Sequence, residues 1–286
     1  MSHRVPRSAF LMFLASGATL IGSYPSARTE GMELVKAGKH EAAAEFFVRL
    51  AGSYPDPVQQ SEALTQAALA TERAGRPEEA MKLADRIPEP EIRQLCQIML
   101  LEEARQWQAL ADKEIDVENW PESLIFPALM ARAHAHSALG QYEQAESDLR
   151  LALNATVSKL NQARVWHTLA QNAVAANAGA DQVLAAYTEV IRLQTSGGGM
   201  LQRGLSERAL FLSGMGRHKE ALADVAELER KTNNDPHWVC TVLIVYGDVY
   251  RSMGETAKAK SSFEKAVAVA NAPTALIESA RKRLAE

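Results

Sequence analysis

The sequence predicts an all-α protein built from helical hairpins that stack one on the next, and three observations lead to this fold class. The chain has 286 residues, of which 47% are hydrophobic but only 6% aromatic. Alanine, leucine and valine supply most of the apolar content, which favours closely packed helices over a sheet. In addition, glycines lie between stretches of helical periodicity, and small residues stand at fixed offsets on both sides of them.

Five glycines set the register of the repeats. Two helices joined by a tight turn approach closely only where side chains are small, and a glycine gives the first helix its left-handed end. The glycines are Gly38, Gly75, Gly140, Gly216 and Gly254. Seven residues earlier stand Gly31, Ala68, Ala133, Ala209 and Gly247, and five residues later stand Ala43, Ala80, Ala145, Ala221 and Ala259. Nine residues after the glycines, Phe47, Ala84, Leu149, Val225 and Phe263 are expected to fill the space between repeats.

Two further hairpins are degenerate. Trp166 and Leu169 open one of them, and its turn, residues 177–181, is one residue longer than the others. The other hairpin, residues 91–116, has no glycine, so residues 105–107 are expected to form its turn before a short second helix. The chain thus contains seven hairpins, spaced 36 residues apart on average.

This register resembles the tetratricopeptide repeat family, whose period is near 34 residues. The last hairpin resembles the family pattern best, with Tyr246, Gly247, Tyr250, Gly254, Ala259, Phe263 and Ala266 at the expected places. The resemblance covers residues 24–271. It implies a right-handed α-α superhelix, in which each hairpin buries its face against its neighbours. It also implies a non-enzymatic module that binds a protein or peptide partner in a concave groove.

The resemblance further implies which residues line that groove, because the first helix of each hairpin faces it. In the N-terminal half, the stripe is mostly apolar and includes Leu69, Leu95 and Met99. In the C-terminal half, it carries Arg164, His167, Gln171, Arg203, Leu210, Asp248 and Arg251. Arginines at fixed helical positions can clasp a carboxylate through paired hydrogen bonds. The same residues also fit a solvated face that binds no ligand.

The first 22 residues resemble a secretory signal peptide. Arg4 and Arg7 precede the apolar run of residues 9–15, and small residues follow. The run is shorter than the roughly 20 residues of a membrane-spanning helix. We therefore expect a secreted or periplasmic protein. An uncleaved membrane anchor and a first helix packed on a cytoplasmic protein are the alternatives.

The opposite end and the overall charge limit the partners. Residues 273–286 form an amphipathic stretch that is expected to cap the solenoid. The 31 basic and 35 acidic side chains give a formal charge of −4, which argues against broad nucleic-acid binding. No other segment of the chain is apolar enough to span a membrane.

The sequence contains no constellation that points to catalysis, a cofactor or a metal. His134 and His136 lie two residues apart, on different faces of a helix, so they cannot share a metal. Cys96 and Cys240 belong to distant hairpins, which predicts two free and largely buried thiols. Four functions remain: an interaction scaffold of the cell envelope, a cytoplasmic adaptor or chaperone, an enzyme, and self-assembly through the apolar half of the groove.

Overall fold

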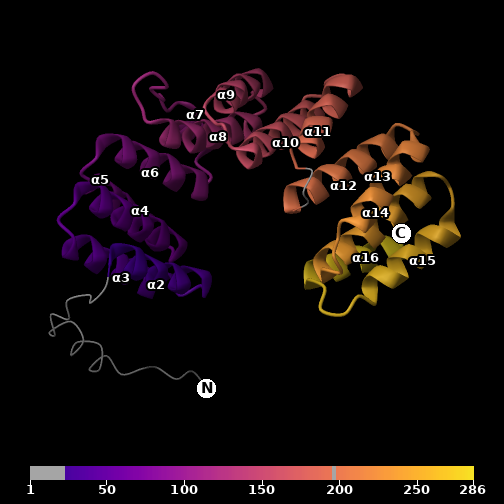
Figure 1. Ribbon diagram of the computed structural model, residues 1–286, viewed down its shortest axis with the longest axis horizontal. Helices are drawn as coiled ribbons and strands as arrows, with labels where there is room; N and C mark the ends of the chain where they lie inside the picture. The colour runs from indigo at the N-terminus through magenta and orange to yellow at the C-terminus, as the bar shows by residue number, and fades with distance from the viewer. Residues whose placement is uncertain (1–22, 195–197) are drawn as a thin grey trace. The chain divides into compact units, whose positions relative to one another are not determined.

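In a computed structural model of the chain, residues 23–194 and 198–286 are described, and helices follow one another along these ranges without a strand (Figure 1). The 15 helices in the described residues accommodate seven consecutive pairs and a final single helix. This arrangement confirms the all-α fold class. The expected signal peptide, residues 1–22, lies outside the described residues. The chain divides into two compact units, one that ends at Leu139 (unit 1) and one from Gly140 to Glu286 (unit 2).

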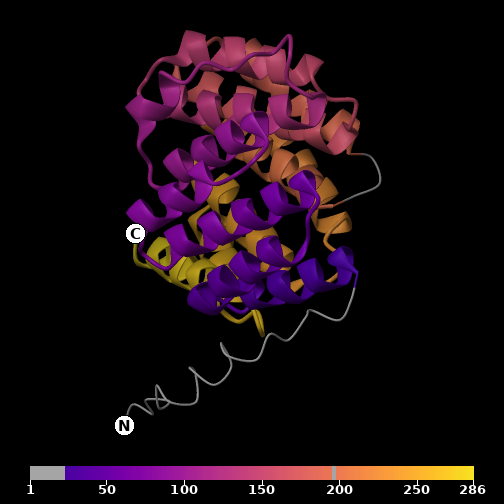
Figure 2. The same cartoon turned by 90° about the vertical axis from the view of Figure 1, so that its left-hand side faces the viewer.

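The described part of unit 1, from residue 23 on, contains seven helices, and each lies beside the helices before and after it in the chain (Figure 2). The first helices of successive pairs also contact one another, as α2 does α4, α4 does α6, and α6 does α8. The helices are α2 (Tyr24–Lys36), α3 (His40–Ser53), α4 (Pro57–Arg73), α5 (Pro77–Asp85), α6 (Pro90–Glu103), α7 (Trp107–Ala111) and α8 (Glu122–Ala138).

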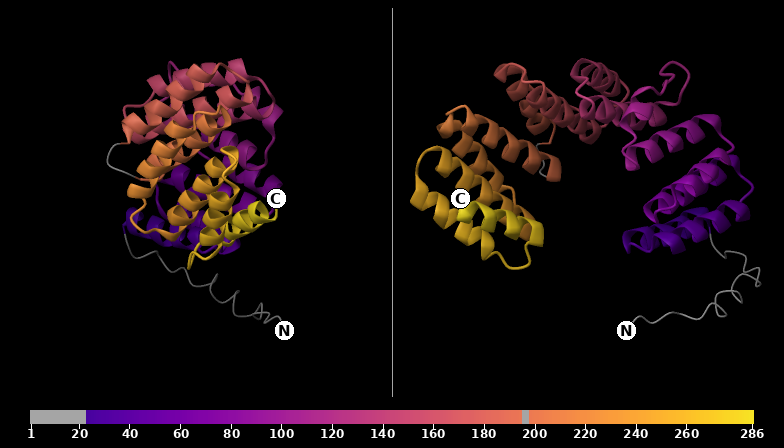
Figure 3. Two further views of the ribbon diagram at one scale, coloured as in Figure 1. Left: turned by 90° about the vertical axis from the view of Figure 1, so that its right-hand side faces the viewer. Right: turned by 180° about the vertical axis from the view of Figure 1, so that it is seen from behind.

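Unit 2 repeats the same pattern of contacts (Figure 3). Here α10 contacts α12, and α12 contacts α14. The second helices α11 and α13 each contact the first helices before and after them in the chain. The helices are α9 (Tyr142–Asn154), α10 (Lys159–Ala175), α11 (Ala180–Leu193), α12 (Gly199–Gly214), α13 (His218–Arg230), α14 (Pro236–Ser252), α15 (Thr256–Val267) and α16 (Thr274–Ala285).

The turns within the pairs follow the predicted register. All five register glycines have a positive φ, between 69° and 78°. In the two degenerate hairpins, Arg105 and Asn177 adopt the same left-handed conformation, with φ values of 53° and 52°. The helix that follows Arg105, α7, is the second helix of its hairpin and has five residues, so it is short, as the sequence predicts. The sequence therefore places the turns correctly even where glycine is missing.

Helix starts have local causes in the sequence. Proline stands in the first turn of α4, α5, α6 and α14, where its missing N–H costs no hydrogen bond. Asp56 caps α4 by accepting a hydrogen bond of 2.9 Å from the backbone N–H of Gln59. Asp235 caps α14 by accepting one of 2.8 Å from His237. These residues fix where the first helices of several pairs begin.

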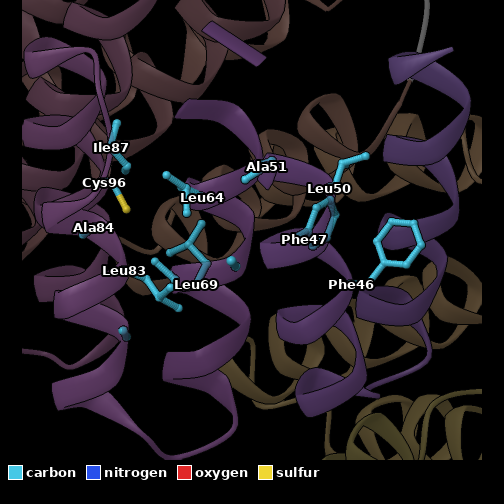
Figure 4. Packing of buried hydrophobic residues seen from close by; sticks show 14 of the residues in the cluster. Phe46, Phe47, Leu50, Ala51, Leu64, Leu69, Leu83, Ala84, Ile87 and Cys96 are labelled. Atoms are coloured by element: carbon cyan, nitrogen blue, oxygen red, sulfur yellow. The ribbon is translucent and has the colours of Figure 1, made fainter. Parts of the chain in front are cut away.

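The core of unit 1 lies between the two helices of each pair and between neighbouring pairs (Figure 4). Phe47 and Leu50 of α3 are fully buried, and they belong to one cluster with Leu69 of α4 and Ala84 of α5. Burying a side chain of the size of Leu or Phe stabilises a fold by roughly 1.5–3 kcal/mol. The cluster continues to Cys96 of α6, so the core runs through successive hairpins.

Candidate partner-binding site

Three of the predicted groove residues lie exposed on the first helices of two successive pairs in unit 2. Arg164 and Gln171 belong to α10, and Arg203 belongs to α12. Within the described residues, none of their three side chains forms a hydrogen bond or an ion pair. Their donors are therefore available to a partner.

A buried contact fixes the two helices relative to each other. His167 of α10 is 6% exposed, and its Nε2 lies 2.9 Å from Oε2 of Glu207 on α12. The hydroxyl of Tyr187, from α11, donates to the same oxygen at 3.2 Å. Burial and the neighbouring Glu207 carboxylate raise the pKa of Tyr187, which keeps this hydroxyl a donor. His167 was predicted to face a partner, but the structure places it in a contact between helices.

This contact brings Arg164 and Arg203 to the same level on neighbouring helices. Arg164 precedes His167 by three residues, and Arg203 precedes Glu207 by four, which is about one helical turn in each case. Packed helices lie roughly 8–10 Å apart. Two guanidinium groups at that separation can approach one carboxylate from two sides.

We call the surface of Arg164, Gln171 and Val174 on α10 with Arg203 and Leu210 on α12 the α10–α12 face.

The other end of the α10–α12 face is apolar. Leu210 is 38% exposed and Val174 is 42% exposed. Leu210 lies seven residues after Arg203, and Val174 lies three residues after Gln171, so both continue the same stripes. Leu210 belongs to the stripe that the sequence predicts, whereas Val174 does not. The face thus changes from cationic to apolar along the helices.

The predicted groove residues of α14 are occupied by the last helix. Nε of Arg283, on α16, donates to both carboxylate oxygens of Asp248, at 2.8 and 3.0 Å. Arg251 donates to Glu286 Oε2 at 2.8 Å and to the carbonyl oxygen of Arg283, and its guanidinium lies 4.8 Å from the centre of the Phe263 ring. Asp248 and Arg251 therefore contact the C-terminal segment that contains α16, whereas the side chains of Arg164, Gln171 and Arg203 have no such partner.

The N-terminal half of the predicted stripe differs from the expectation. Met99 of α6 is half-buried and packs against the core of unit 1. Leu69 and Leu95 of the same stripe are buried. These apolar side chains of the stripe therefore contribute to the core.

Neither cysteine thiol is prepared to act as a nucleophile. Cys96 and Cys240 are free and buried, as predicted. Burial raises the pKa of both thiols, to about 12 for Cys96, which disfavours the nucleophilic thiolate. In the described ranges, no group of three or more His, Cys, Asp or Glu side chains is placed to hold a metal ion. No helix among the described residues is long and apolar enough to cross a membrane.

Comparison with known proteins identifies the repeats. A sequence model of the tetratricopeptide repeat matches residues 126–156 and 241–273. The chain contains tetratricopeptide repeats. Among curated proteins, none matches the chain significantly in sequence.

Solved structures of tetratricopeptide repeat proteins share the fold. A crystal structure of a tetratricopeptide repeat protein from Parabacteroides merdae is 18% identical, with a TM-score of 0.51, over 92% of this chain and 99% of that chain. The C-terminal part of a repeat-containing protein from Cytophaga hutchinsonii is 13% identical, with a TM-score of 0.52, over 90% of this chain and 98% of that chain. The second matched repeat, residues 241–273, covers most of α14 and all of α15, where the sequence resembles the family pattern best.

Proposed function

We propose that this tetratricopeptide repeat protein is a protein-interaction scaffold of the cell envelope that holds an extended segment of its partner on the α10–α12 face. The fold itself supports an interaction scaffold, and tetratricopeptide repeat proteins are generally non-enzymatic. The observation that carries the proposal is the pair of exposed, unpartnered arginines, Arg164 and Arg203, next to the exposed Leu210 and Val174.

The spacing on this face predicts the ligand. Arg203 and Leu210 are separated by seven residues, which is about 10 Å along a helix. An extended peptide advances about 3.3 Å per residue. The preferred segment therefore carries a carboxylate about three residues from a leucine, isoleucine, valine or phenylalanine. Gln171 lies seven residues after Arg164, at the level of Leu210, and offers an amide to the backbone of that segment.

A selection from a library of displayed random peptides tests this function. The wild-type protein is expected to enrich peptides with that acidic and apolar spacing. Arg164→Glu together with Arg203→Glu should weaken their binding at least about tenfold, because each charge reversal replaces attraction by repulsion. The matched control is Arg150→Glu with Arg230→Glu, which makes the same charge change on the second helices α9 and α13. Equal loss in both double variants would contradict the proposed face.

The envelope location has support of its own and a separate test. It rests on the basic start and the apolar run within residues 1–22. Intact mass and cell fractionation of protein expressed from Met1 should show loss of roughly 18–27 residues in the exported fraction. A full-length mass in the cytoplasm would contradict export and would favour the cytoplasmic adaptor.

A further inference from the structure

Unit 1 contains a cavity of about 420 Å³. It lies where the N-terminal ends of α4, α6 and α8 meet α2, and residues of all four helices line it. Its volume falls within the range of about 300–1,000 Å³ that is usual for ligand pockets. All of its lining residues belong to unit 1.

The charge of this cavity is negative. Three carboxylates line it, from Glu62, Glu89 and Glu91, against one guanidinium, from Arg28. Nε of Arg28 lies 3.9 Å from Oε2 of Glu62, so the cation is offset toward one carboxylate. Among the described residues, the carboxylates of Glu89 and Glu91 have no hydrogen-bond or ion-pair partner. Two acceptors on the rim are thus free for a cationic group.

The rest of the lining is largely apolar. Val58 of α4 is 50% exposed, and Ile92 of α6 and Leu124 of α8 are partly exposed at the same cavity. An exposed valine beside two other aliphatic side chains gives an apolar wall that a ligand would remove from water. The cavity therefore combines an apolar wall with an uncompensated negative rim.

We propose that this cavity, the acidic pocket, binds a peptide segment of a protein partner in which a lysine or arginine lies beside an aliphatic or aromatic side chain. The cation pairs with Glu89 and Glu91, while the neighbouring apolar side chain contacts Val58, Ile92 and Leu124. The proposal goes beyond the α10–α12 face, because it concerns another unit and a ligand of the opposite charge. It also requires no contribution from Arg164 or Arg203.

Titration of the full-length protein with a fluorescent, amide-capped octapeptide that alternates leucine and arginine tests the pocket. Glu89→Gln with Glu91→Gln should weaken binding about tenfold, because two charge-assisted contacts are lost. Glu41→Gln with Glu78→Gln is the matched control, since both residues are exposed in the first turns of α3 and α5 and neither lines the pocket. This control should bind like the wild type. Equal weakening in both double variants would overturn the proposal.

Further arms of the experiment separate the components of the pocket and its other occupants. Val58→Ser should weaken the octapeptide a few-fold, and Arg164→Glu with Arg203→Glu should leave its affinity unreduced. Full displacement of the peptide by spermidine at equal concentration would identify a small organic cation and overturn the peptide proposal. Binding that appears only after removal of residues 1–22 would assign the pocket to this chain's own N-terminal segment instead. A wild-type dimer that Glu89→Gln with Glu91→Gln dissociates would assign the pocket to a second copy.

Discussion

The ring of Phe263 fills the space that a side chain at Gly247 would need. A Cβ atom on Gly247 would lie 2.6 Å from Cδ1 of Phe263, which is closer than real Cβ contacts. Gly31 and Phe47 have the same relationship in unit 1, where a Cβ on the glycine would lie 2.5 Å from Cζ of the ring. In both hairpins, the glycine and the phenylalanine are separated by 16 residues. The first and last repeats therefore use the same pairing of a missing side chain with a large one.

Replacing Gly247 by alanine should destabilise the protein. The added methyl group must displace the fully buried Phe263 ring, and such overpacking costs about 1–3 kcal/mol. Urea unfolding measures the change. Gly214→Ala is the control, because a Cβ there meets nothing within 4 Å and α12 should gain up to about 1 kcal/mol. Similar effects of the two substitutions would contradict the close approach.

The repeat register could be predicted from sequence because its causes are local. Small residues and glycines recur at fixed offsets, and each turn lies between two helices that are close in sequence. Even the turn at Arg105, which has no glycine, could be placed by counting from its neighbours. The left-handed conformation of Arg105 itself, with a φ of 53°, is a finding of the structure.

Arg105→Gly should stabilise the third hairpin. Arg105 has a φ of 53°, a conformation that costs a residue with a Cβ atom about 1–2 kcal/mol. Glycine removes this strain, but it also raises the conformational entropy of the unfolded chain, which offsets part of the stabilisation. The expected net increase in the free energy of unfolding is about 0.5–1 kcal/mol. Gly75→Ala, at a φ of 78°, should give a loss of about 1 kcal/mol in the same assay. A stabilised Gly75→Ala protein would contradict this account of the turns.

The ion pair between Asp248 and Arg283 should stabilise the attachment of α16 to α14. Both side chains are partly buried, and the contact joins residues 35 apart in sequence. A double-mutant cycle with Asp248→Asn and Arg283→Gln should give a coupling free energy of about 1 kcal/mol in thermal unfolding. The exposed pair of Glu189 and Arg192 within α11 serves as a reference and should couple by less than about 0.5 kcal/mol. Equal coupling in the two pairs would argue against a special role of the α16 contact.

The candidate site was less predictable than the fold, because tertiary contacts decide which of the predicted side chains are used within the protein and which stay free. Counting positions within one repeat cannot show that His167 of α10 contacts Glu207 of α12, which belongs to the next repeat. It cannot show either that Arg283 of the last helix reaches Asp248. The sequence did not single out Glu89 and Glu91, because their convergence on one cavity depends on the positions of four helices.

The stability of the protein should fall as the pH rises from about 9 to about 12, in part through Cys96. Burial raises the pKa of this thiol from an ordinary value near 9 to about 12. In that range the unfolded chain loses the proton and the folded chain keeps it, so alkali favours unfolding by up to about 1.4 kcal/mol per pH unit. Cys96→Ala removes this contribution while the tyrosines titrate unchanged. Parallel unfolding curves against pH for the two proteins would contradict the burial of the thiol.

Site-specific photocrosslinking in cells tests most directly whether a partner binds the α10–α12 face. A benzophenone amino acid replaces Leu210 on that face or, as the control, Leu151 on α9, which is equally exposed but belongs to a second helix. The account predicts a discrete crosslinked protein from position 210, located in the envelope fraction, that is lost with Arg164→Glu and Arg203→Glu. The absence of an adduct at position 210, or the same adduct from position 151, would contradict it.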